Sequence, residues 1–150
     1  MKEISYEKAL ARAASLCSVG EHCCSDIREK LLRWGLEEDD VQRVIQYLKD
    51  ENYIDNERYA RAFCHDKLLY NHWGRQKMQL MLRAAGLSSS EIRHGIEALS
   101  PDEYHSILLQ TLRQKMNTLH EQDAYARRAK LIRHLLSRGF LMDEILEVLS

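Results

Sequence analysis

The sequence predicts an all-α protein built from three tandem three-helix repeats, which form an elongated, curved array. Three observations support this fold class. The 150 residues include one proline and six glycines, so the backbone has few obligatory turns. Leu, Ala, Arg, Glu and Lys, which all favour helices, dominate between those turns. One apolar pattern also recurs three times, each time centred on a glycine.

The repeated pattern surrounds Gly35, Gly86 and Gly139, which are 51 and 53 residues apart. Apolar residues stand eight and four positions before each glycine, and one, six and ten positions after it. They are Ile27, Leu31, Leu36, Val41 and Ile45, then Met78, Leu82, Leu87, Ile92 and Ile96, then Leu131, Leu135, Phe140, Ile145 and Leu149. Steps of four on both sides of a glycine are typical of two amphipathic helices joined by a tight turn. The predicted helices are 23–34 and 37–50, 75–85 and 89–99, and 122–138 and 141–149.

A further helix is predicted before each pair, over 5–17, 56–70 and 101–116. Ser100 is the expected N-cap of the last of these, followed by a proline at the first helical position and a glutamate at the third. Asp55 is the expected cap of the helix that begins at residue 56, and Ser88 forms the same box with Glu91. The three predicted domains are residues 1–54, 55–100 and 101–150.

Composition narrows the function classes. With 45% hydrophobic and 30% charged residues, the chain is that of a water-soluble folded protein. It has no run of about 18 apolar residues and no apolar N-terminal stretch, so we expect a cytoplasmic protein without membrane contact. No phosphate-binding loop, metalloprotease motif or nucleophile elbow occurs, and we therefore expect neither catalysis nor a cofactor.

The four cysteines are interpreted as reduced thiols, because they are too few and too unevenly spaced for a disulfide framework. Cys17, His22, Cys23 and Cys24 include zinc-ligand types, but three of them are consecutive, unlike the paired spacing of closed zinc sites. We interpret Cys17 and Cys24 as core residues. Cys64 and His65 are adjacent on one predicted helix and do not face each other.

Charge is distributed unevenly although the net charge is −1. The helix before each glycine tends to be basic, and the helix after it is acidic. A helix-turn-helix reader of DNA would use the helix after the turn, which phosphates would repel here. Repetition would instead place basic faces side by side along one surface, which predicts six contact residues for a partner or for DNA: Arg75, Lys77, Arg83, Arg127, Lys130 and Arg133. The alternative is that these faces are simply solvated.

The segment from Tyr53 to Ala60, Tyr-Ile-Asp-Asn-Glu-Arg-Tyr-Ala, resembles a motif of the bacterial RecX family. So do Gly74-Arg75-Gln76-Lys77-Met78, the run from Leu82 to Leu87, and the run from Glu21 to Leu31. The resemblance covers essentially the whole chain and is weaker in the last third. It implies tandem three-helix repeats without catalytic activity, which bind the RecA–DNA filament within its helical groove. It also implies inhibition of RecA ATP hydrolysis, strand exchange and co-protease stimulation in DNA repair.

Arg58, within the first motif, is a seventh candidate for partner contact, although it could instead form a local ion pair with Asp55. Tyr53 and Ile54 are predicted to be scaffold residues, and Trp34 and Trp73 to cap cores at helix ends. We expect a monomer that binds naked duplex DNA weakly. The alternative function is a general helical-repeat module for protein–protein interaction, without nucleic-acid contact.

Overall fold

The computed structural model describes residues 4–150, which fold into nine α-helices with no strand in that range. Unit 1 contains α1 (Tyr6–Val19), α2 (Cys24–Arg33) and α3 (Glu38–Asp50). Unit 2 contains α4 (Asn56–Asn71), α5 (Arg75–Ala84) and α6 (Ser89–Glu97), and unit 3 contains α7 (Pro101–Thr118), α8 (Ala124–Ser137) and α9 (Met142–Leu149). The predicted all-α repeat architecture is confirmed, with helix ends that differ from the prediction by one or two residues. None of the helices in this range has the length and apolar character needed to cross a membrane.

The predicted caps form as expected. The Asp55 side chain accepts hydrogen bonds from the backbone N–H groups of Glu57 and Arg58 at the start of α4. Ser88 and Glu91 form a reciprocal capping box at α6. Ser100 accepts from the Glu103 N–H at α7, where Pro101 fills the first helical position. These caps satisfy backbone donors that a helix start leaves unpaired, so α4, α6 and α7 each begin at a defined residue.

The three repeated glycines end the second helix of each unit in the left-handed conformation. Their φ angles are 93° at Gly35, 89° at Gly86 and 98° at Gly139, values that side chains other than hydrogen tolerate poorly. The apolar positions around them have the same environment in every unit. Those at −8, −4, +1 and +6 are buried in all three units, and the one at +10 is half-buried in all three. The spacing that repeats in the sequence therefore corresponds to side chains that are buried in the same way in every unit.

The buried residues form two separate hydrophobic cores. One lies wholly within unit 1, from Ala9 to Ile54. The other is continuous through units 2 and 3, from Ala60 to Ile145, and receives Cys23 as its one buried residue from unit 1. Trp34 packs against the first core and Trp73 against the second, as predicted for aromatic residues at helix ends. Ile54 is a buried scaffold residue, whereas the predicted scaffold residue Tyr53 is 37% exposed.

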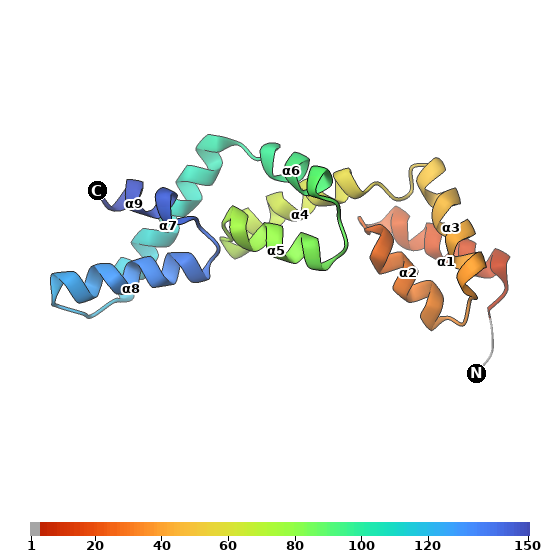
Figure 1. Ribbon diagram of the computed structural model, residues 1–150, viewed down its shortest axis with the longest axis horizontal. Helices are drawn as coiled ribbons and strands as arrows, with labels where there is room; N and C mark the ends of the chain where they lie inside the picture. Colours follow the sequence, from red (N-terminus) through yellow and green to blue (C-terminus); the bar gives the residue numbers. More distant parts are fainter. Residues whose placement is uncertain (1–3) are drawn as a thin grey trace.

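The units follow one another in an elongated, curved array rather than forming one bundle (Figure 1). Unit 1 lies at one end of the long axis and unit 3 at the other (Figure 1). The second helices of the units, α2, α5 and α8, all lie along the lower edge in this view. Two of these helices, α5 and α8, carry six of the basic residues that the sequence predicts as contacts.

Candidate functional site

The candidate functional site is the edge formed by α2, α5 and α8, which we call the second-helix edge. Arg83 on α5 and Arg133 on α8 are exposed, and neither forms an ion pair with an acidic side chain within residues 4–150. Arg128, also on α8, is exposed and has no such partner in that range either. Two of the six contact residues predicted on these helices are therefore available as free cations on the surface.

Two other predicted contact residues hold the loop before α8. Lys130 Nζ lies 2.9 Å from Glu121 Oε1, and the hydrogen bond and charge of Lys130 lower the pKa of that carboxyl group. Arg127 donates from its guanidinium to the backbone carbonyl of Leu119 at 3.3 Å. Both side chains thus fasten the connection between α7 and α8. Both lie on α8 and so on the second-helix edge, but their charged groups already contact Glu121 and the Leu119 carbonyl.

Arg75 and Lys77 lie at the junction between units 2 and 3. Arg75 Nε is 3.0 Å from Glu144 Oε2, an ion pair without the alignment of a hydrogen bond, and the guanidinium lies over the Tyr104 ring at 4.7 Å. The Tyr104 hydroxyl accepts from the Arg75 backbone N–H at 3.1 Å and donates to Glu144 Oε1 at 2.9 Å. Lys77 Nζ is 4.8 Å from the centroid of the Trp73 ring. Arg75 therefore contacts unit 3 through Glu144 and Tyr104 and helps to hold units 2 and 3 together.

At this junction, burial and the neighbouring charges shift the pKa values of Tyr104 and Arg75. Burial raises the pKa of Tyr104 to about 12, against the opposing effect of its contacts with Arg75, so the hydroxyl remains a neutral donor. Burial by itself would lower the pKa of Arg75, but Tyr104 and Glu144 outweigh it and the net shift is upward. The side chain of Glu144 is 16% exposed and also accepts from the Leu141 N–H at the start of α9. One carboxylate thus joins α5, α7 and α9.

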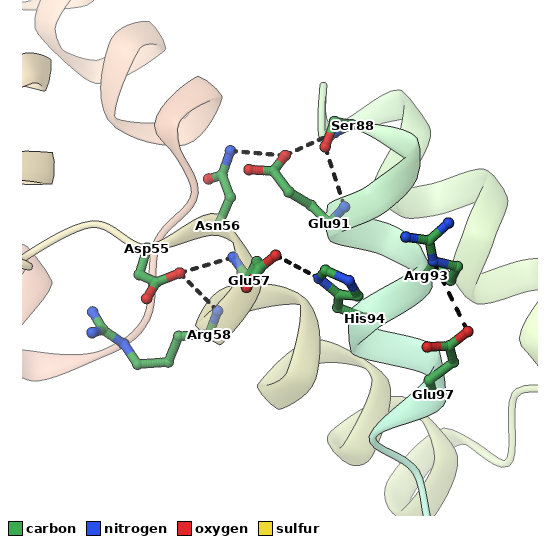
Figure 2. Close-up of polar contacts among 9 residues, drawn as sticks. All are labelled: Asp55, Asn56, Glu57, Arg58, Ser88, Glu91, Arg93, His94 and Glu97. Carbon is green, nitrogen blue, oxygen red and sulfur yellow. Dashed lines mark hydrogen bonds and ion pairs between the residues drawn. The ribbon is translucent and has the colours of Figure 1, made fainter.

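The junction between units 1 and 2 is built from the motif at residues 55–58 (Figure 2). Asn56 Oδ1 accepts from the Cys24 N–H at 3.0 Å, and its amide group donates to Glu91 Oε1 at 3.4 Å. Glu57 Oε1 is 2.5 Å from Nδ1 of His94 on α6. The motif therefore connects the start of α4 to α2 on one side and to α6 on the other.

Arg58 contacts unit 1 and does not form the local ion pair with Asp55. Its Nε lies 2.6 Å from Glu21 Oε1, in the loop between α1 and α2. The same guanidinium donates to the backbone carbonyls of Asn52 at 3.2 Å and Tyr53 at 3.3 Å. In Figure 2 the side chain extends to the side of α4 that faces away from α6. At 36% exposure, the Arg58 side chain is mainly a contact between units 1 and 2.

The two junctions follow the same plan. The start of α2 lies on the start of α4 and on the turn at Gly86, where the Ser25 hydroxyl donates to the Ala85 carbonyl. The start of α5 lies on the start of α7 and on the turn at Gly139. There the Gly74 N–H donates to the Arg138 carbonyl at 2.8 Å, and the Gln76 N–H to the Gly139 carbonyl at 2.9 Å. Units 1 and 2 thus each place their second helix, which has no side-chain cap, on the glycine turn of the next unit.

Sequence reasoning missed the acidic partners at these junctions. Glu91 and Glu144 each stand five residues after a repeated glycine, and Asp40 is the equivalent residue in unit 1. This recurring acid is visible in the sequence, but a repeat defined by apolar spacing does not include it. Glu21 carries no comparable signal, because its role depends on the position of Arg58 in space.

The cysteines are free thiols in this structure, two buried and two half-buried. Burial raises the pKa of all four, that of Cys64 to about 12. Within residues 4–150, no group of three or more His, Cys, Asp or Glu residues is arranged to hold a metal ion. The thiols therefore belong to the packing of the units.

Three protein-family models match successive parts of the chain. The model described as "RecX, first three-helix domain" matches residues 9–48, the second three-helix domain matches residues 55–96, and the third matches residues 102–149. Each match lies within one structural unit of α-helices.

Curated relatives and solved structures carry the same family name. A "Regulatory protein RecX" of Clostridium botulinum (strain Eklund 17B / Type B) is 32% identical over 126 residues, covering 83% of this chain and 58% of the relative. That of Prosthecochloris aestuarii is 30% identical and covers 100% and 97%. The chain thus spans less than two thirds of the clostridial relative. The crystal structure of RecX from Lactobacillus salivarius matches with a TM-score of 0.86 at 17% identity, covering 96% of this chain and 94% of that one.

Proposed function

Because the chain belongs to the RecX family, we propose that it is a non-enzymatic cytoplasmic regulator that binds the RecA–DNA filament and inhibits RecA ATP hydrolysis and strand exchange. The family resemblance supplies the partner. The observation that carries the proposal physically is the second-helix edge, which runs along the elongated array (Figure 1). Its exposed cations include Arg83, Arg128 and Arg133. A long, curved surface of this kind can follow a helical groove, whereas a compact bundle could contact it at one place only.

The structure also supports a division of labour among the seven predicted contact residues. Arg83 and Arg133 are free to contact phosphate or an acidic protein surface. Arg58 and Arg75 are engaged in junctions, so they would act on the partner by fixing the direction in which neighbouring units point. With a net charge of −1, specific contacts rather than overall attraction would bind the filament.

The charge-reversed variant Arg83→Glu/Arg133→Glu is expected to inhibit DNA-dependent ATP hydrolysis by the cognate RecA at least about tenfold less effectively than the wild-type protein, because two cationic contacts become repulsive. The measurement is the concentration of protein that halves the ATP hydrolysis rate on single-stranded DNA. Arg61→Glu/Arg113→Glu is the matched control, since these exposed arginines lie on α4 and α7 outside the second-helix edge. It should inhibit like the wild-type protein.

Two outcomes would contradict the proposal. A wild-type protein that leaves both ATP hydrolysis and strand exchange unchanged over a wide concentration range would not be a RecA regulator. If the wild-type protein inhibits and both double variants inhibit equally well, the regulator contacts the filament through another surface, and the second-helix edge is only a solvated face.

A further inference from the structure

We propose that the junction between units 1 and 2 is a polar hinge, about which unit 1 rotates as one rigid body against units 2 and 3 as another. Such a hinge is a property of the fold, whatever the partner is. The two hydrophobic cores divide at this junction: one is confined to unit 1, and the other is continuous through units 2 and 3. Rigid bodies in a protein are set by shared close-packed cores, and here the division falls between α3 and α4.

The contacts across this junction are nearly all polar. They are the ion pair of Arg58 with Glu21, the hydrogen bond from the Cys24 N–H to Asn56, and the hydrogen bond from Ser25 to the Ala85 carbonyl. Water can replace each of these contacts when the junction opens, because the partners lie at or near the surface. Cys23 is the one buried side chain of unit 1 that enters the core of the other body.

The junction between units 2 and 3 has the same arrangement of helices, but its contacts include apolar packing within a shared core. There the Tyr104 ring lies edge-on to the Phe140 ring, with 5.7 Å between centroids, and both belong to the shared core. Gly74 packs so closely on the turn at Gly139 that a Cβ atom at Gly74 would overlap the backbone of residues 139 and 140. Rotation at this junction would expose apolar surface and break backbone hydrogen bonds, so the second and third units move together.

Open space at the first junction is consistent with movement. Two cavities of about 470 and 380 Å³ flank it, and both are lined by Cys24 of α2 and Lys49 of α3. Gly86 of unit 2 also lines the first, and Ser88 and Glu91 of unit 2 also line the second. The connection between the bodies turns at Asn52, which adopts a positive φ of 61°. A tilt of unit 1 would therefore withdraw only one fully buried side chain, that of Cys23, from the core of units 2 and 3.

Pulsed electron paramagnetic resonance tests the hinge on the full chain, with spin labels on a non-natural amino acid so that the native thiols are untouched. One label pair at positions 8 and 61 spans units 1 and 2, and the control pair at positions 61 and 113 spans units 2 and 3; all three native residues are exposed. Asn56→Ala/Arg58→Ala is expected to broaden and shift the distance distribution of the first pair while leaving that of the control pair unchanged. An unchanged 8–61 distribution in a variant that retains its helical circular dichroism would overturn the proposal.

Two further variants test the hinge if the double variant fails to fold: a milder substitution, and a disulfide that links unit 1 to unit 2. Glu21→Gln removes the negative charge that faces Arg58, from an exposed loop position, and should also broaden the 8–61 distribution, by less than the double variant does. In Ser25→Cys/Gly86→Cys, a Cβ atom at position 86 would lie 3.8 Å from that of residue 25, a distance suited to a disulfide. Oxidation should narrow the 8–61 distribution, and reduction should restore its width. A width that does not change with oxidation, once peptide mapping has confirmed the disulfide, would show that the junction is already rigid.

Discussion

Replacing Gly139 with alanine is expected to lower the free energy of unfolding of units 2 and 3 by about 3 kcal/mol or more. Gly139 has a φ of 98°, and alanine there incurs the left-handed penalty of about 1–2 kcal/mol. The added Cβ would also overlap Lys77 Cβ and approach the Lys77 backbone N to 2.8 Å. Since the backbone of α5 cannot shift without breaking the hydrogen bonds that Gly74 and Gln76 donate, overpacking adds to the conformational cost.

Gly86→Ala is the matched control. Gly86 has a nearly identical φ of 89°, but a Cβ there would meet only the Ser25 side chain, at 3.8 Å, which is ordinary contact. It should therefore lose only the conformational part, about 1–2 kcal/mol. Urea unfolding followed by fluorescence in a Trp34→Phe background isolates Trp73, which belongs to the core of units 2 and 3. Equal losses in the two variants would show that the turn at Gly139 is not tightly packed against α5.

Much of this fold could be predicted from the sequence because one interaction dominates it. Burial of apolar side chains requires the same spacing in every unit. The apolar positions around Gly35, Gly86 and Gly139 therefore predict the pairs of helices directly. Local capping chemistry then fixed the helix starts at Asp55, Ser88 and Ser100. Both signals depend only on residues close in sequence, which a single sequence displays completely.

The candidate site could be predicted only in part, because the availability of a charge depends on residues distant in sequence. Arg75 and Arg83 look equivalent on the sequence, yet Glu144, 69 positions away, engages the first and leaves the second free. Arg58 stands three residues after Asp55 on one helix turn, but Glu21 outcompetes that neighbour across the junction. The basic pattern therefore did not separate the cations engaged at junctions from those free at the surface.

The motif at residues 55–58 acquires a physical explanation from these contacts. Asp55 starts a helix, Asn56 joins α2 to α6, Glu57 meets His94, and Arg58 reaches Glu21 (Figure 2). Four consecutive polar residues thus each contact a different group at the junction between units 1 and 2. The motif by which the chain resembles its family therefore sets the geometry between units, and the proposed function assigns direct partner contact to the exposed cations of the second-helix edge.

Leu135→Ala is expected to reduce the free energy of unfolding of units 2 and 3 by roughly 3–5 kcal/mol. Leu135 is fully buried in the core that these units share, and its truncation leaves a cavity that the neighbouring α-helices cannot close without shifting. The adjacent Leu136 is 41% exposed, so Leu136→Ala, the same chemical change on the next residue of α8, should cost about 1 kcal/mol or less.

The same Trp73 fluorescence in the Trp34→Phe background measures both leucine variants. Trp34 fluorescence in a Trp73→Phe background should show that the unit 1 transition hardly moves in Leu135→Ala, because unit 1 has its own core. A loss of similar size in both transitions would mean that the three units unfold together and that the polar junction couples the two cores. A selective loss in units 2 and 3 would show that the energetic boundary of the array lies where its hydrophobic packing is interrupted.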